Sequence, residues 1–158
     1  LERADNTSRI IDVKYFTLLP SLHAVGSALD IVQWAAVLRT CSGFEAFRKS
    51  RRGQLNLEHV VDYLVRDENF PRSVLYAVRH AGFALDCITA EAPHLADSPA
   101  RRLVAQLHDE LAGTVIADVI ADGLHEYLDA IQLKLAGIHA AVQETFINYS
   151  TDGAKMLS

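Results

Sequence analysis

Four polar side chains near the start of the chain, Glu2, Arg3, Asn6 and Arg9, are the residues best suited to chemistry. A carboxylate can act as a general acid or base, and a guanidinium group binds carboxylates and phosphates through parallel hydrogen bonds. On a helix, which turns by about 100° per residue, Glu2, Asn6 and Arg9 share one face. The spacing therefore predicts a polar face that could bind a charged partner or substrate.

Two interpretations of this polar face compete. In the first, the face is solvated and Asp5 reaches Arg9, and Glu2 reaches Asn6, at the i, i+4 spacing. Such exposed pairs add little stability. In the second, the face is a buried polar cluster at a second helix–helix interface, where every group needs a partner. Spacing alone favours the solvated face, because structural ion pairs are common on protein surfaces.

Two further candidates, His125 and Glu126, belong to the stretch His-Glu-Tyr-Leu-Asp at positions 125–129. This stretch is similar to a zinc-binding helix, except that Asp129 stands where the second histidine would be. Because only two ligands are in view, we predict no metal site and no cofactor. Glu126 lies close to the apolar seam of its helix, where a carboxylate is costly unless paired. The candidate partners for this carboxylate are Arg3, Arg9 and Arg72.

Arg72 is the last candidate, in the stretch Asn-Phe-Pro-Arg-Ser at positions 69–73. Proline favours the first turn of a helix, so Pro71 places Arg72 and Ser73 at a helix N-terminus. Backbone N–H groups and the helix dipole favour anions there. The simpler interpretation, a proline-started helix with a surface arginine, explains the same residues and is preferred.

Composition limits the classes of protein that the chain can belong to. The chain has 158 residues, of which half are apolar and 22% are charged, and its formal net charge is −5. This is enough for one globular domain with a core. The acidic balance argues against binding to nucleic acid, and no apolar run is long enough to cross a membrane. Cys41 and Cys87 occur in apolar helical contexts, which predicts two buried thiols and a cytoplasmic location.

Hydrophobic periodicity predicts helices throughout, with no alternating pattern typical of strands. We expect helices over residues 1–19, 27–41, 44–49, 56–66, 71–89, 98–113 and 124–148, with a break within 114–123. Asn56 and Ser98 are expected to cap their helices. The predicted core stripes include Ile31, Ile88 and Val115.

The predicted fold is all-α, an antiparallel bundle of about five to seven helices joined by short loops. We expect one domain over residues 1–149 and a tail over residues 150–158.

The opening segment, Leu-Glu-Arg-Ala-Asp-Asn-Thr-Ser-Arg-Ile-Ile-Asp-Val at positions 1–13, resembles the alpha-E proteins of bacteria. These proteins are named for a Glu-Arg motif, which is Glu2-Arg3 in this chain. Further similar segments follow in the family's order. They are residues 18–21 (Leu-Leu-Pro-Ser), 32–34 (Val-Gln-Trp) with 38–39 (Leu-Arg), 70–73 (Phe-Pro-Arg-Ser) and 123–128 (Gly-Leu-His-Glu-Tyr-Leu).

The resemblance implies a helical fold and a role in peptide or amide-bond modification, because alpha-E proteins accompany an ATP-grasp ligase-like protein and a transglutaminase-like protease. It implies that Glu2, Arg3, Asn6 and Arg9 are the best site candidates, followed by Arg72, His125 and Glu126. Family members are typically about twice as long and have two related halves. The chain resembles the second half, so we also expect self-association through the surface that the other half would meet.

Three functions follow from these observations. The first is a helical accessory or partner domain in the peptide-modifying system. The second is an enzyme in which Glu2 or Glu126 acts as acid or base, while Arg3, Arg9 or Arg72 binds a carboxylate or phosphate. The third is a structural module in which the polar cluster is an ion network that fixes the helix register.

Overall fold

The computed structural model describes residues 1–18, 28–50 and 55–147, and these residues form helices without any strand. The all-α prediction is therefore confirmed. The eight helices are α1 (Glu2–Leu18), α2 (Ala28–Thr40), α3 (Phe44–Ser50), α4 (Leu57–Arg66), α5 (Val74–Glu91), α6 (Pro99–Gly113), α7 (Ile116–Asp122) and α8 (Leu124–Val142). A 3₁₀ turn, Pro93–Leu95, precedes α6, and a π-helical turn, Gln143–Ile147, follows α8.

The number of helices exceeds the predicted five to seven by one, because α7 occupies the stretch predicted as a break. The predicted tail over residues 150–158 lies outside the described residues. No helix in the described part of the chain has both the length and the apolar character that a membrane crossing requires.

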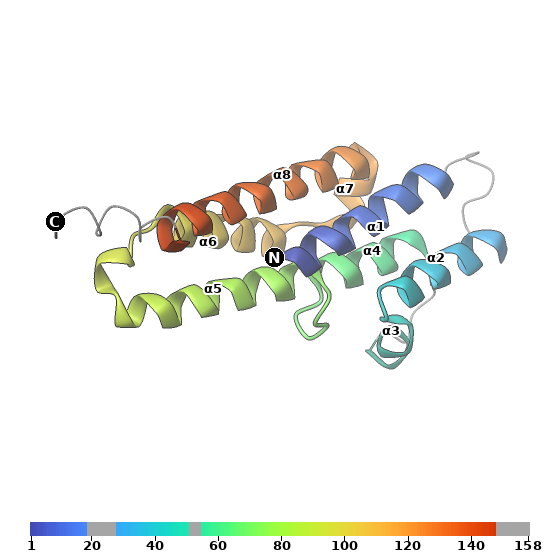
Figure 1. Cartoon of the computed structure of the whole chain (residues 1–158). Helices are drawn as coiled ribbons and strands as arrows, with labels where there is room; N and C mark the ends of the chain where they lie inside the picture. Colours follow the sequence, from blue (N-terminus) through green and yellow to red (C-terminus); the bar gives the residue numbers. More distant parts are fainter. Residues whose placement is uncertain (19–27, 51–54, 148–158) are drawn as a thin grey trace, which may run out of the picture.

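Helix α1 lies at the centre of the arrangement (Figure 1). It packs against α8 on one flank and against α5, α4 and α2 on the other, while α6 packs against α5 and α8. Ala4 and Ile11 of α1 are fully buried in the core. These two residues mark the inward side of α1, and the opposite side of the helix faces solvent.

An aromatic cluster fixes the corner between α2, α3 and α4. The ring of Tyr63 meets Phe47 edge to face at a centroid distance of 5.2 Å and stacks on Phe70 at 4.8 Å. Gly43 lies directly against Phe70, since a β-carbon at this position would come within 2.9 Å of the ring. All three rings are almost fully buried, so they anchor the stretch that leads from α4 to Arg72.

Capping residues decide where two of the helices begin. Asn56 caps α4 as predicted, with its Oδ1 accepting a hydrogen bond from the His59 amide at 2.9 Å. Helix α5 begins at Val74 rather than at Pro71, because the Ser73 hydroxyl accepts the Tyr76 amide at 3.0 Å and acts as the N-cap. The cap therefore takes precedence over the proline signal, and Arg72 lies before the helix.

Ser98 occupies the predicted cap position of α6, but its side chain makes no capping hydrogen bond.

Three residues predicted to face the core, Ile31, Ile88 and Val115, are exposed, and so is Cys87, whereas Cys41 is buried as expected. Ile31 and Ile88 lie near the ends of α2 and α5, where the helical periodicity continues but no described helix covers the side chain. Val115 is an extended residue between α6 and α7, so the helical pattern does not apply to it. Burial raises the pKa of the Cys41 thiol to about 11, so this thiol stays protonated.

Arg66 joins the end of α4 to the end of α6. Its Nε donates to the carbonyl of Leu111 at 3.2 Å, and its Nη2 donates to the carbonyl of Ala112 at 3.1 Å. Its Nη1 pairs with Asp62 at 3.2 Å. The last carbonyls of a helix lack partners within the helix, so the guanidinium group caps α6 from a neighbouring helix.

Candidate functional site

The exposed face of α1 carries the Glu-Arg pair. Glu2, Asn6, Arg9 and Val13 are exposed at the spacing i, i+4, i+7 and i+11, and Arg3 is exposed beside them. Among the described residues this face is therefore solvated, as the spacing favours, and the alternative of a buried polar cluster does not hold there. We call Glu2, Arg3, Asn6 and Arg9 the α1 polar face.

Asp5 and Arg9 form the ion pair that the i, i+4 spacing predicts. The Arg9 Nε donates to the Asp5 carboxylate at 2.8 Å. This hydrogen bond raises the pKa of Arg9, and the negative charges of Asp5, Asp12 and Asp129 add to the effect. The guanidinium group thus stays protonated and is oriented toward the side of α1 that faces α8.

A surface hollow of about 390 Å³ lies between α1 and α8. Its charged and titratable side chains are Glu2, Asp5, Arg9 and His139. Leu1, Leu135 and Ala136 supply its apolar lining. The hollow therefore offers carboxylates, a guanidinium group and an imidazole next to apolar surface, which suits a ligand or side chain that combines charged and apolar parts.

His125 reaches Asp12 on the neighbouring helix rather than Asp129 on its own. The His125 Nδ1 and the Asp12 carboxylate are 2.7 Å apart, which joins the start of α8 to α1. The hydrogen bond with Asp12 raises the pKa of His125, and the charges of Asp12, Glu126 and Asp129 act in the same direction. No group of three or more possible metal ligands occurs among the described residues.

Glu126 lies close to the apolar seam in sequence, as expected, but its side chain is exposed, so its carboxylate does not need an arginine partner. Its side chain folds back toward Gly123, where a β-carbon would collide with the carboxylate. This position places negative charge at the N-terminus of α8, where the helix dipole favours it.

The two ends of the α1–α8 pair hold different candidates. Helices α1 and α8 run antiparallel, because Asp12 meets His125 at one end while Glu2 and His139 line the hollow at the other. Ten residues separate Glu2 from Asp12, which corresponds to about 15 Å along the helix axis. Glu2 and Glu126 therefore do not meet at one reacting atom.

Arg72 lies on the other flank of α1. The hydroxyl of Thr7, which is buried, donates to the Arg72 carbonyl at 2.8 Å. Thr7 and Asp5 differ by two residues, or about 200° of helical turn, so Arg72 and the α1–α8 hollow occupy opposite flanks. The side chain of Arg72 is exposed, and it does not line the hollow.

The structure thus brings Glu2 and Arg9 together with two residues that the sequence did not single out, Asp5 as a lining residue and His139. His139 follows Leu135 of the α8 seam by four residues, and this spacing was the available signal. Asp12 was missed as the partner of His125 because the two residues are 113 positions apart.

A protein-family model, Alpha-E, described as a predicted alpha-helical domain with a conserved ER motif, matches residues 1–147. Glu2-Arg3 is the one Glu-Arg dipeptide in the sequence, so it is the pair that corresponds to this description. No curated protein matches the chain significantly. No solved structure matches it significantly either.

Proposed function

The chain belongs to the Alpha-E family, and from this premise we propose that it is a helical partner domain whose α1 polar face docks another protein of a peptide- or amide-bond-modifying system. The proposed partners are an ATP-grasp ligase-like protein and a transglutaminase-like protease. The domain supplies a recognition surface, and the chemistry belongs to the partner.

The observation that carries this proposal is that the Glu-Arg motif named in the family's description is exposed. Glu2 and Arg3 are exposed, and the core of the described residues is completed without them. A conserved polar pair that contributes nothing to the core is better explained by binding than by folding. A rigid helix that is packed on both flanks also holds such side chains in fixed positions, which reduces the entropy lost on binding.

The composition of the α1–α8 hollow is a second observation that supports the proposal. It lies beside Glu2 and Arg9 and exposes apolar surface from Leu135 and Ala136. Interfaces typically combine an apolar centre with a polar rim. Charged groups around an apolar hollow therefore favour the docking of a protein segment with a charged residue next to an apolar one.

The structure leaves fewer candidate residues for an active site than the sequence suggested. Glu2 and Arg9 share the hollow, whereas His125 and Glu126 lie at the other end of α1, about 15 Å away along the axis. A catalytic site would have to use Glu2, Asp5, Arg9 and His139 alone. If Glu2→Gln abolished a reaction of the purified chain while leaving partner binding intact, the partner proposal would be replaced by the enzymatic one.

The test is affinity capture of the tagged chain from its native host, with identification of bound proteins by mass spectrometry. We expect a ligase-like or protease-like protein to be recovered and to be lost with the double variant Glu2→Gln/Arg3→Gln. The control is Glu45→Gln/Arg48→Gln on α3, which removes an exposed Glu/Arg pair elsewhere on the surface. Equal recovery with all three proteins, or no such partner with the unaltered chain, contradicts the proposal.

A second copy of the chain, bound through the α1 polar face, is the competing occupant of this surface. Sedimentation of the purified chain distinguishes the two cases. A dimer that dissociates in the Glu2→Gln/Arg3→Gln variant would assign the face to a second copy of the chain.

A further inference from the structure

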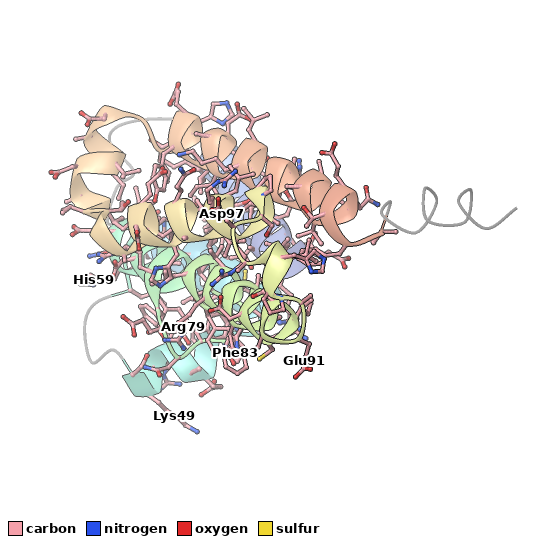
Figure 2. The ribbon with its side chains drawn as sticks, turned by 90° about the vertical axis from the view of Figure 1, so that its left-hand side faces the viewer. Lys49, His59, Arg79, Phe83, Glu91 and Asp97 are labelled. Atoms are coloured by element: carbon pink, nitrogen blue, oxygen red, sulfur yellow. The ribbon has the colours of Figure 1, made fainter. Side chains whose placement is uncertain are left out.

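A basic surface lies where α2 meets α3, and it shares no residue with the α1 polar face or the α1–α8 hollow. Residues 39–50 contain three exposed cationic side chains, Arg39, Arg48 and Lys49, but only one carboxylate, Glu45. Figure 2 shows Lys49 at the outer edge of α3 with its side chain directed away from the other helices. The chain as a whole has a formal net charge of −5. We call Arg39, Arg48 and Lys49 the basic corner, because its charge is opposite to that of the whole chain.

The positive charges of the basic corner are not neutralised by the described part of the chain. There, the side chains of Arg39 and Lys49 form neither an ion pair nor a hydrogen bond. Arg48 approaches Glu45 only to 4.0 Å, and 65% of the arginine and 74% of the glutamate side chain are exposed. Such an exposed contact contributes little stability. The corner therefore has a true excess of positive charge, which favours a partner with negative charge.

The ring of Phe44 holds the two arginines of the basic corner. The Cζ atom of Arg39 lies 4.4 Å from the ring centroid, and the Cζ atom of Arg48 lies 5.8 Å from it. A guanidinium group is attracted to an aromatic face, and this contact does not use the N–H groups at the edge of the guanidinium plane. Both arginines can therefore donate to carboxylates while the ring restricts their positions.

The turn between α2 and α3 gives the basic corner a fixed backbone. Ser42 has a φ of 55°, and the Gly43 amide donates to the Leu38 carbonyl at 2.7 Å. Phe47 of α3 is 2% exposed and meets Tyr63 of α4 edge to face. Because α3 is anchored in this way, the corner does not have to rearrange on binding, which lowers the entropic cost of association.

An apolar stripe on α2 leads to the basic corner. Leu29, Val32, Ala36 and Arg39 follow the spacing i, i+3, i+7 and i+10, so they lie within about 80° of one another around the helix axis. Leu29 is 62% exposed and Val32 is 61% exposed, whereas Trp34, on the other side of α2, is buried. From Leu29 to Arg39 the stripe is about 15 Å long, or nearly three helical turns. This length suits a second helix that lies along α2.

We propose that the α2 stripe and the basic corner dock an acidic amphipathic helix of a second partner protein, distinct from the partner of the α1 polar face. Apolar side chains of that helix pack along Leu29 and Val32, and its carboxylates bind Arg39 and Arg48. Amphipathic helices bind through such spaced apolar residues, and clusters of arginines recognise acidic motifs. The inference does not depend on the function proposed for the α1 polar face.

The distribution of charge favours a short protein segment over a nucleic acid or a membrane. At physiological ionic strength charges are screened over about 8 Å, so a segment that contacts only the basic corner and the stripe experiences the local positive charge. A long nucleic acid or an anionic bilayer also faces the acidic remainder of the chain. The apolar stripe, in addition, offers no favourable contact to a phosphate backbone.

The test uses fluorescence anisotropy with a labelled synthetic peptide of about 18 residues, long enough to form a helix in water. Leucines occupy the i, i+3 and i+7 positions on one face of the peptide and glutamates most of the other positions. A matched peptide with lysines in place of the glutamates is the charge control. We expect saturable binding of the glutamate peptide, no binding of the lysine peptide, and weaker binding at higher salt because the ionic contacts are exposed.

Two variants of the chain locate the binding surface. Arg39→Gln/Arg48→Gln should weaken binding of the glutamate peptide at least about tenfold, because two groups that donate to its carboxylates are lost. Val32→Ser should weaken binding about threefold or more, because the stripe loses apolar contact area. Circular dichroism establishes that each variant is folded.

Three control variants carry matched changes elsewhere on the surface. Arg79→Gln/Arg102→Gln removes two exposed arginines from α5 and α6, and Leu133→Ser removes a leucine of α8 that is 68% exposed. Both should bind the glutamate peptide as the unaltered chain does. Glu2→Gln/Arg3→Gln should also bind it normally, so that failure of this proposal and failure of the function proposed for α1 can be distinguished.

Three outcomes overturn the proposal. The glutamate peptide fails to bind at concentrations up to about 1 mM, or it binds equally to the unaltered chain and to the Arg39→Gln/Arg48→Gln variant. In the third outcome, a single-stranded DNA oligonucleotide of the same charge, or vesicles of equal parts phosphatidylserine and phosphatidylcholine, bind more tightly than the peptide. That result would assign the basic corner to a nucleic acid or to a membrane surface.

Discussion

Replacing Ile11 should destabilise the fold strongly, whereas replacing the Glu2-Arg3 pair should leave the stability almost unchanged, although all three residues lie on α1. Ile11 is fully buried in the core, so Ile11→Ala removes core packing and leaves a cavity. The expected loss in the free energy of unfolding is about 2–5 kcal/mol. For a chain of this length that corresponds to a fall in the melting temperature of roughly 5–20 °C. Glu2→Gln/Arg3→Gln changes only exposed groups and should stay within about 0.5 kcal/mol of the unaltered chain.

The assay is unfolding in urea, followed by circular dichroism and by the fluorescence of Trp34, the single tryptophan, which is almost completely buried. Coincident transitions from the two probes justify a two-state free energy. If the Glu2-Arg3 double variant lost as much stability as Ile11→Ala, the pair would hold the fold together, and our assignment of the α1 polar face to binding would be refuted. An Ile11→Ala loss below about 1 kcal/mol would instead contradict the packing of α1.

Three further variants test individual parts of the structure. Gly123→Ala should destabilise the chain by about 1–3 kcal/mol in thermal unfolding, because Gly123, which precedes α8, has a φ of 139° that is unfavourable for a residue with a side chain. Gly137→Ala, in the interior of α8 where a β-carbon meets no atom within 4 Å, should instead stabilise the chain by about 0.5–1 kcal/mol. The same sign for both changes would contradict the backbone at the start and in the interior of α8. Because Asp12 raises the pKa of His125 above its ordinary value, this pair stabilises the folded state at low pH and the contribution is lost as pH rises through the folded pKa. The melting-temperature difference between the unaltered chain and His125→Gln should therefore be larger at about pH 5.5 than at about pH 8.5, and a pH-independent difference would exclude the pair. Arg66→Met should cost about 1–3 kcal/mol in urea unfolding, because two helix-terminal carbonyls lose their donor, and Arg66→Lys should not restore it, since lysine lacks the planar set of donors.

The sequence was sufficient to predict seven of the eight helices, all except α7, and the inward and outward sides of α1. Periodicity places Ala4 and Ile11 on one side of α1 and Glu2, Asn6 and Arg9 on the other, and both placements depend only on local spacing. The start of α5 was misplaced because two valid signals compete over three residues, and the Ser73 hydrogen bond takes precedence over Pro71.

The contents of the candidate site could not be predicted in the same way, because they depend on how distant helices pair. The Asp12–His125 hydrogen bond and the position of His139 beside Glu2 both require the antiparallel register of α1 and α8. Helical spacing contains no information on that register. The exposure of Glu126 could not be predicted for a related reason, since its carboxylate lies close to the seam in helical projection but folds toward Gly123 and solvent.

The most direct test of the α1 polar face is a calorimetric titration of the purified chain with the proposed partner, an ATP-grasp ligase-like protein encoded by the native host. The account predicts saturable binding that weakens at least about tenfold in Glu2→Gln/Arg3→Gln. It also predicts an unchanged affinity in the Glu45→Gln/Arg48→Gln control and unchanged melting temperatures in both variants. Affinity that is the same for all three chains, or no heat of binding with the unaltered chain, would contradict it.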